Sequence, residues 1–263
     1  MSVGVVIPTR NMGGSLEKAL ESACSQFPDR VIVVDDASED NTPSVVDRFA
    51  KRCSFVECVR WEKKQPCHVS ALRPIFLDLG CAHSIGLAAD DILLPGIVDA
   101  IRGHLHQAVI FTHYSCELAG NPELRWEAKH PYVETTELSP LEMRERIQTQ
   151  PSVETGIGSS LREDVTRWLW DNEWDSLGPH SDSIGYATAA AIFGCVYLPI
   201  YGAHISFNPK GYGQKESDKD PDFWSDRVRE FTSRVGLDEL TSNALIQKRC
   251  YYNLNEQFWF HCE

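Results

Sequence analysis

The sequence has few basic residues for its acidic content. Among its 263 residues, 25 are Lys or Arg and 38 are Asp or Glu, so the formal net charge is −13. This balance argues against a nucleic-acid partner, because binding phosphates requires Lys and Arg grouped on one face, and the sequence shows no such group. The hydrophobic fraction of 42% is ordinary for a folded protein, which excludes a mostly disordered chain.

Two kinds of motif are also missing. The nine Cys residues are scattered, and none belongs to a C-x-x-C or His/Cys pair with the spacing of a zinc site. We therefore expect reduced thiols in a cytoplasmic protein. The first predicted strand is not followed by G-x-G-x-x-G, which argues against an NAD-dependent oxidoreductase.

Long uninterrupted hydrophobic runs are absent as well. The apolar run 3–7 is too short for a signal peptide and has no basic segment before it. The stretch 186–203 approaches membrane-spanning length, but a proline and two glycines interrupt it, so it predicts an Ala-rich helix followed by a strand at 195–201. The aromatic segment 251–260 leaves peripheral contact with the inner face of a membrane, or a dimer contact, open.

The first ninety residues alternate between strand and helix patterns. Apolar, mainly β-branched runs predict strands, and 3.6-residue periodicity predicts the helices between them. This order predicts a mixed, mostly parallel sheet between two helical layers, an α/β/α fold. The predicted strands are 3–7, 31–34, 54–59, 84–88 and 108–114; the predicted helices include 16–23, 43–52, 68–82, 139–149 and 160–171.

Helix 43–52 has a clear start signal, with Thr42 as the expected N-cap and Pro43 at the first helical position. Near the other end of the chain, Trp224, Val228, Phe231 and Val235 recur on one helical face, which predicts a helix packed on the core. The segment 208–222, directly before this second helix, is rich in Gly, Pro, Lys and Asp. It predicts a loop that closes over bound donor.

Paired acids follow two of the predicted strands, Asp35–Asp36 after one and Asp90–Asp91 after the other. The carboxyl ends of parallel strands share one edge of a sheet, where ligands of open α/β folds bind. Each pair on its own is typical of a turn or a helix cap. Four carboxylates at one edge repel each other, however, and a divalent cation carried by a diphosphate would relieve that repulsion.

Three segments together resemble family 2 glycosyltransferases. They are V-I-P-T-R-N at 6–11, V-V-D-D-A-S-E-D-N-T at 33–42 and A-D-D-I-L-L-P-G at 89–96. The resemblance runs from residue 3 to about 206. It implies the GT-A fold of nucleotide-diphospho-sugar transferases and a hexosyltransferase-like enzyme. Such an enzyme moves a sugar from a nucleotide-diphosphate donor to a glycan or lipid-linked acceptor hydroxyl, usually with inversion and with Mn²⁺ or Mg²⁺, as in polysaccharide biosynthesis.

The resemblance assigns the donor side to residues at the ends of the first strands. The loop with Arg10 would line the base and ribose, and this Arg replaces an aromatic residue that often stacks on the base. Asp36, with Asp35 beside it, would accept the base N–H, and Arg73 would lie near the diphosphate, although Pro74 stands where Asn is usual. The residues implied for donor binding are Pro8, Thr9, Arg10, Asp35, Asp36, Arg73, Asp90 and Asp91.

The same resemblance implies a metal site that departs from the family pattern. The Asp-x-Asp motif reads Ala88-Ala89-Asp90, so its first Asp is missing. Asp90 would bind the metal with Asp91 in support, and the cation would draw charge from the departing diphosphate. His204, in the segment that resembles Tyr-Arg-x-His, would contact the metal or the diphosphate, with a purely structural role as the alternative.

The acceptor side is implied by Ser181-Asp182, which resembles the family's Glu-Asp pair with Ser in place of Glu. Asp182 would be the general base, because an alcohol is a poor nucleophile until its proton is removed. The alternative for Asp182 is a cap of the helix that follows it. Trp168, Trp170 and Trp174 could stack on an acceptor sugar or pack in the core.

These observations predict a catalytic domain at 1–206, with a nucleotide-sugar half (1–100) and an acceptor half (101–206). A loop and helical extension would follow at 207–263. Two other functions stay open. A binding module without catalysis is suggested by Ala88 and Ser181. A sugar nucleotidyltransferase is less favoured, because the loop after the first strand lacks the required density of Gly and basic residues.

Overall fold

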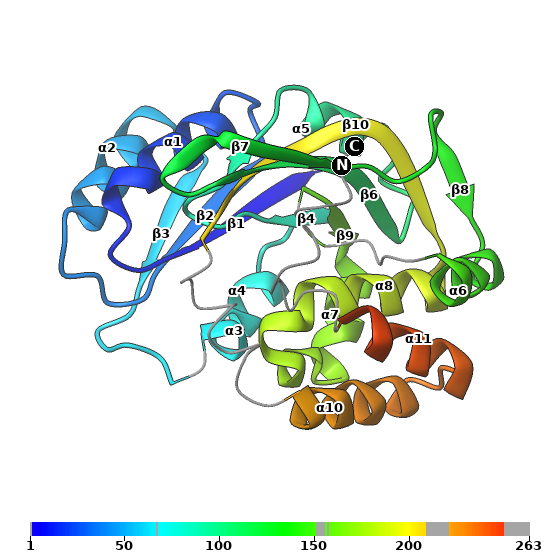
Figure 1. Cartoon of the computed structure of the whole chain (residues 1–263). Helices are drawn as coiled ribbons and strands as arrows, with labels where there is room; N and C mark the ends of the chain where they lie inside the picture. Colours follow the sequence, from blue (N-terminus) through cyan, green and yellow to red (C-terminus); the bar gives the residue numbers. More distant parts are fainter. Residues whose placement is uncertain (1, 67, 151–155, 157, 209–220, 250–263) are drawn as a thin grey trace.

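The structure is a computed structural model that describes residues 2–66, 68–150, 156, 158–208 and 221–249. Within these residues ten strands form one sheet, with helices against both faces (Figure 1). The sheet has the order β3–β2–β1–β4–β9–β6–β10–β5, while β7 pairs with β6 and β8 with β10. The strands are β1 (Val3–Thr9), β2 (Arg30–Asp35), β3 (Val56–Arg60), β4 (His83–Gly86), β5 (Ile92–Leu93), β6 (Val109–Leu118), β7 (Asn121–Ala128), β8 (Thr136–Leu138), β9 (Ser160–Arg162) and β10 (Cys195–Phe207).

The sheet is mixed, as the sequence predicts. β3, β2, β1 and β4 run parallel to one another, so their carboxyl ends lie at one edge. β10 is parallel to β6, whereas β9 is antiparallel to both of its neighbours and β5 is antiparallel to β10. The antiparallel pairing of β5 with β10 brings the segment after β4 beside the end of β10.

Helices cover the sheet on both sides, which confirms the three-layer α/β/α fold. In Figure 1, α1, α2 and α5 lie above the sheet, and the remaining helices lie below it. The helices are α1 (Gly13–Cys24), α2 (Thr42–Arg52), α3 (His68–Ala71), α4 (Arg73–Leu77), α5 (Ile97–Arg102), α6 (Pro140–Thr149), α7 (Glu163–Asp171), the 3₁₀ helix η1 (Trp174–His180), α8 (Ser181–Phe193), α10 (Pro221–Arg234) and α11 (Glu239–Arg249).

Alternate residues of the central strands serve the two hydrophobic cores. Val5 and Ile7 of β1 pack with the residues from α1, α2 and α5, whereas Val6 packs with those from the lower helices. The same alternation holds in β2, where Val31 and Val33 are on the first side. A strand buried on both faces requires a continuous apolar run, and this is what made both strands predictable from sequence.

Three predicted elements differ in detail from the structure. The N-cap of α2 is Asn41 rather than Thr42, because Thr42 already lies within the helix and uses its hydroxyl elsewhere. The predicted helix 68–82 is two short helices, α3 and α4, with Pro74 in the first turn of α4, where a missing N–H is tolerated. The predicted helix 160–171 begins only at Glu163, because residues 160–162 form β9.

The stretch 186–203 is divided between α8 and β10, as predicted. Among the residues that the structure describes, no helix is both long enough and apolar enough to cross a membrane. The predicted loop 208–222, apart from its first and last residues, and the aromatic segment 251–260 lie outside the described residues.

The helices after residue 220 pack on the rest of the chain. α10 contacts η1, and α11 contacts α6. Trp224, Val228 and Phe231 of α10 are buried, as the helical periodicity predicts. The domain boundary at 206 stays a prediction; the described part of the extension shares its hydrophobic core with the acceptor half.

Candidate functional site

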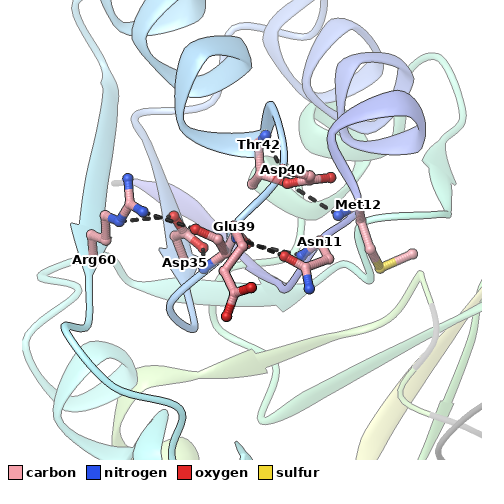
Figure 2. A network of polar contacts seen from close by, with 8 residues as sticks. Asn11, Met12, Asp35, Glu39, Asp40, Thr42 and Arg60 are labelled. Carbon is pink, nitrogen blue, oxygen red and sulfur yellow. Dashed lines mark hydrogen bonds and ion pairs between the residues drawn. The ribbon is translucent and has the colours of Figure 1, made fainter.

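Two loops at the carboxyl edge of the sheet are bound to each other, one after β1 and one after β2 (Figure 2). The carboxylate of Asp40 accepts hydrogen bonds from the backbone N–H groups of Gly13 (3.1 Å) and Thr42 (2.9 Å). The hydroxyl of Thr42 in turn accepts one from the N–H of Met12 at 3.1 Å. A side chain at Gly13 would collide with Asn41, so the close approach of the loops requires glycine there.

Asn11 fixes the turn between β1 and α1. Its φ of 51° lies in the left-handed region, which Asn tolerates better than most residues. Its N–H donates to the Ser38 hydroxyl (2.9 Å), and its side-chain oxygen accepts from the N–H of Glu39 (2.8 Å), as Figure 2 shows in part. The two loops therefore form one fixed platform beside the ends of β1 and β2.

Several polar atoms at this platform are buried without a hydrogen-bond partner among the described residues. They are Thr9 Oγ1, Arg10 Nη1 and Asp35 Oδ2. Asp35 is fully buried, its Oδ1 accepts from the N–H of Ser38, and Arg60 Nε lies 3.5 Å from its Oδ2. Asp35 Oδ2 is thus ion-paired, whereas Thr9 Oγ1 has no partner among the described residues. An unsatisfied buried polar atom is costly, which is a reason to expect a polar ligand here.

Asp36 is also buried, at 2% exposure. Its Oδ1 accepts a hydrogen bond from the N–H of Gln65 at 2.8 Å, and Arg10 Nη1 lies 4.0 Å from its Oδ2. A carboxylate and a guanidinium thus lie side by side at the end of β1 and β2. Pro8 precedes them and is partly exposed.

An open depression of about 390 Å³ lies next to this platform. It is lined by Ala37, Ser38, Glu39, Arg60, Trp61 and Glu62. Arg60 also donates to the backbone carbonyl of Ser38 at 2.8 Å, which ties the end of β3 to the loop after β2. Ala37, Ser38 and Glu39 belong to the segment 33–42 that resembles the family, whereas Arg60, Trp61 and Glu62 lie outside every predicted site.

The second pair of acids lies between β4 and β5. Asp91 is buried, at 8% exposure, and its Oδ1 accepts a hydrogen bond from the N–H of Ser206 in β10 at 3.1 Å. Asp90 is less buried, and Ala88, at the position of the missing Asp, is exposed. The hydrogen-bond donor to Asp91 therefore comes from β10, 115 residues further along the chain.

A third acid, Asp182 of α8, lies within electrostatic range of Asp91. It lies in the first turn of α8, where its Oδ1 accepts the N–H of Ser183 at 2.7 Å. Burial raises the pKa of Asp182, and the Ser183 N–H partly opposes this. The pKa of Asp90 is also raised by burial.

The charges of Asp90 and Asp182 act on the carboxylate of Asp91. Burial, then the charge of Asp90 and the charge of Asp182, raise the pKa of Asp91 from 3.8 to about 7, against the effect of the Ser206 N–H. Asp90 and Asp182 are thus each close enough to Asp91 to repel its carboxylate. Among the described residues, no group of three His, Cys, Asp or Glu side chains is arranged as a complete metal site. The arrangement still fits Mg²⁺ or Mn²⁺, because such ions often bind through one or two carboxylates together with substrate phosphates.

Comparison with known proteins identifies the family. The family model described as Glycosyl transferase family 2 matches residues 4–159, more than half of the chain. The chain belongs to glycosyltransferase family 2. The match includes both pairs of acids after β2 and β4. No curated protein matches the sequence.

Solved structures show the same fold. The chain is similar to S. aureus TarS 1–349 in complex with UDP-GlcNAc, with a TM-score of 0.66, 17% identity and coverage of 99% of this chain and 73% of that one. It spans 44% of the longer S. aureus TarS. Mannosyltransferase PcManGT from Pyrobaculum calidifontis, in complex with GDP-Man and Mn²⁺, gives a TM-score of 0.58 and 17% identity, covering 96% of this chain and 70% of that one. The fold of this family 2 glycosyltransferase is therefore GT-A.

His204, implied as a metal ligand, has other partners in this structure. Its Nδ1 lies 2.8 Å from the Ser115 hydroxyl, and its Nε2 lies 3.3 Å from Glu117 Oε2. His204 pairs with Ile92 of β5, and Ile92 directly follows Asp91 in the sequence. The family assignment for His204 stays a prediction.

Arg73, implied at the diphosphate, lies at the start of α4. Its Nη2 is 3.0 Å from Asp171 Oδ1 at the end of α7, and both side chains are exposed. Nearby, the Ser70 hydroxyl donates to Asp175. Arg73 is thus engaged on the helical layer, and its role toward a donor also stays a prediction.

The tryptophans of α7 and η1 serve the core. Trp170 and Trp174 are buried, with their rings 5.3 Å apart, and Trp168 packs edge-on against Phe193. Packing in the core therefore accounts for these tryptophans better than stacking on an acceptor sugar.

The sequence gives no role to Ser206 or Gln65, and it places Asp40 in a motif without assigning its contacts. Ser206 and Gln65 act through backbone N–H groups, which carry no residue signature. Asp40 had a signal, since it lies two residues before a helix that begins with Thr-Pro, where an Asp commonly binds backbone N–H groups.

Proposed function

We propose that this family 2 glycosyltransferase transfers a sugar from a nucleotide-diphosphate donor to an acceptor hydroxyl, with inversion and with Mn²⁺ or Mg²⁺. The observation that carries the proposal is the buried carboxylate of Asp91 at the edge where β4 ends, which lies within range of the charges of both Asp90 and Asp182. Buried like charges are unfavourable unless a cation neutralises them. Solved relatives by fold are described with UDP, UDP-GlcNAc, GDP-Man and Mn²⁺, which supports this class of donor.

In this proposal the base and ribose lie on the platform of Pro8, Thr9 and Arg10, with Asp36 accepting the base N–H. Asp35 supports Arg60 and the loop after β2. The diphosphate lies toward Asp90 and Asp91, and Arg73 would reach it by leaving Asp171. A bound divalent cation supplies stabilisation of the negative charge on the leaving diphosphate.

Asp182 is the general base of the proposed mechanism. Burial keeps its pKa above that of an ordinary Asp, which makes it a better proton acceptor near neutral pH. It would take the acceptor proton as the hydroxyl attacks the anomeric carbon, while the diphosphate leaves from the opposite face. The attack inverts the configuration at that carbon.

The test combines binding and turnover. Stabilisation by UDP or GDP with Mn²⁺ is measured by thermal shift, and release of the nucleoside diphosphate from UDP-GlcNAc and GDP-Man measures turnover. We expect Asp90→Ala to abolish the Mn²⁺-dependent stabilisation. We expect Asp182→Asn to keep it and to lower turnover by about 10²–10⁴. Asp47→Asn, on the exposed face of α2, is the matched control.

Unchanged Mn²⁺-linked stabilisation in Asp90→Ala would reject the metal assignment, and near-normal turnover in Asp182→Asn would reject the base. One observation favours a second function, a nucleotide-sugar or glycan-binding module: Ala88 is exposed where the family has its first Asp. Binding without turnover, unaffected by Asp182→Asn, would support that module. The acceptor class, a role in polysaccharide biosynthesis and a cytoplasmic or membrane-peripheral location belong to the proposal and are not needed for this test.

A further inference from the structure

Two buried histidines lie against each other with tilted rings. His113 lies in β6, and His130 follows β7. Their ring centroids are 4.0 Å apart with an angle of 40° between the planes, and they are 7% and 9% exposed. Neither residue has a part in the proposed mechanism.

The buried surroundings of both rings favour the neutral form. His130 Nε2 lies 3.0 Å from the carbonyl oxygen of Leu198, so this nitrogen carries the proton and donates it. Nδ1 of His130 and Nδ1 of His113 are buried and have no hydrogen-bond partner among the described residues. A second proton on His113 would create a charged N–H group without an acceptor in a buried place. On His130 such a proton would face the backbone of Tyr132, whose effect on the pKa is smaller than that of burial.

The groups around His113 do not offset such a charge. Lys129 lies over the ring of Tyr201, and Tyr201 contacts His113 edge-on at 5.3 Å. Glu127 is the anion on this side, but its carboxylate is engaged with Lys129 Nζ at 2.6 Å, at the surface. Burial, and then the Lys129 charge, lower the pKa of His113.

The groups around His130 are aromatic or cationic. Its ring contacts Tyr197 at 4.8 Å and Tyr132 at 5.9 Å, and the guanidinium of Arg146 lies over both tyrosine rings. Burial, and then the presence of His113, lower the pKa of His130 to about 4. One proton on the pair therefore places a cation against a second imidazole and beside Arg146.

The pair contacts β10 where its pairing is irregular. The register of β10 against β6 shifts between Leu198 and Tyr201, and again between Tyr201 and Ala203. His130 holds the carbonyl of Leu198 at one end of this stretch, and His113 contacts Tyr201 within it. Beyond the irregular stretch, the same strand supplies the Ser206 N–H to Asp91.

We propose that His113 and His130 form an acid-sensitive switch for the end of β10. While both rings are neutral, their contact holds residues 198–203 against β6. Uptake of a proton separates the rings, frees the irregular stretch and releases Asp91 from its backbone donor. The effect on donor binding rests on the proposed function, whereas the loosening of β10 does not.

The expected increase in the open fraction of residues 198–203 follows from the difference in the proton affinity of the histidines between the closed and the open state. If His130 has its ordinary pKa of 6.5 when the stretch opens and about 4 when it is closed, lowering the pH from 7 to 5 increases the open fraction about 20-fold. His113 adds to this, because its pKa is shifted in the same direction.

Hydrogen exchange of the full chain at pH 7 and pH 5, corrected for intrinsic rates, tests the proposal. We expect the amides of 196–206 to lose protection about 20-fold at pH 5, while amides of β1 change much less. In a variant that combines His113→Phe with His130→Gln, the pH effect on β10 should fall below about threefold, because no ring remains to take up the proton. His106→Gln, at an exposed position, is the matched control and should behave like the wild type.

Imidazole NMR of the wild type keeps the test independent of the variant's folding. We expect His113 and His130 to stay neutral at pH 5, with His130 protonated on Nε2. Protonation of both rings in the folded protein at pH 5, or equal loss of protection in β1 and β10, would overturn the switch. A thermal-shift titration with UDP and Mn²⁺ at both pH values follows. If nucleotide binds at neither pH, the proposed function fails while the exchange result still decides the switch.

Discussion

Asp91 provides the sharpest test of the electrostatics at the site. The structure holds this carboxylate buried, beside Asp90 and within range of Asp182, and raises its pKa from 3.8 to about 7. In the unfolded chain the same group would ionise near its ordinary pKa. Between pH 3.8 and 7 the folded protein therefore binds a proton that the unfolded protein has released, so wild-type stability falls as the pH rises through this window.

Replacing the carboxylate by an amide of the same shape removes this dependence. One pKa unit corresponds to about 1.4 kcal/mol, so the shift of Asp91 destabilises the ligand-free wild type by as much as about 4 kcal/mol at pH 8. We expect Asp91→Asn to raise the free energy of unfolding by up to that amount at pH 8, and by less than about 2 kcal/mol at pH 5. The Asn side-chain oxygen can still accept the Ser206 N–H, which limits any structural loss.

Urea unfolding without metal or nucleotide, at pH 5 and pH 8, measures the difference, and Asp47→Asn controls for the loss of one surface charge. The reasoning is wrong if Asp91→Asn is no more stable than the wild type at pH 8, or if the gain is as large at pH 5. UDP with Mn²⁺ should stabilise the wild type and have little effect on Asp91→Asn. A residue that costs stability when the site is empty and supports ligand binding is typical of functional sites.

Two further predictions concern parts of the chain away from the site. His83 is fully buried between Ser160 and the Leu105 carbonyl, and burial lowers its pKa to about 4. Its contribution to the free energy of unfolding, up to about 3 kcal/mol, is present above pH 6.5 and is lost as the pH falls toward 4. The free energy of unfolding of His83→Gln should therefore depend less on pH in that window. Phe231→Ala in α10 should lower the free energy of unfolding by about 3–5 kcal/mol, whereas Phe223→Ala, nearly half exposed, should change it little; equal effects in chemical denaturation would show that α10 is not part of the core.

The strands of the donor half could be predicted because their cause is local. Every residue from Val31 to Val34 is buried, and only a run without polar residues can occupy a strand covered on both faces. β9 could not be predicted in this way, since its three residues are a strand only through pairing with β4 and β6. Its sequence, Ser160–Arg162, continues directly into α7 and was included in the predicted helix.

The site shows the same division between local and distant causes. Topology alone places the acids after β2 and β4 at one edge, so their grouping could be expected from the strand pattern. The different burial of Asp90 and Asp91 could not be predicted from the sequence. It depends on the pairing of β5 with β10 and on a backbone N–H from Ser206. The sequence therefore assigned the principal role to Asp90, while the structure gives Asp91 the deeper position and the more strongly perturbed pKa with a value of about 7.

For Asp182, the two interpretations drawn from sequence describe one geometry. The residue lies in the first turn of α8, where the helix dipole and the Ser183 N–H favour the ionised form. Burial opposes this and prevails, since the pKa of Asp182 is raised overall. An acid that the helix end holds in place, and that burial makes more basic, is suited to accept a proton from a hydroxyl. The helix-terminal position therefore supports the proposed role in catalysis instead of competing with it.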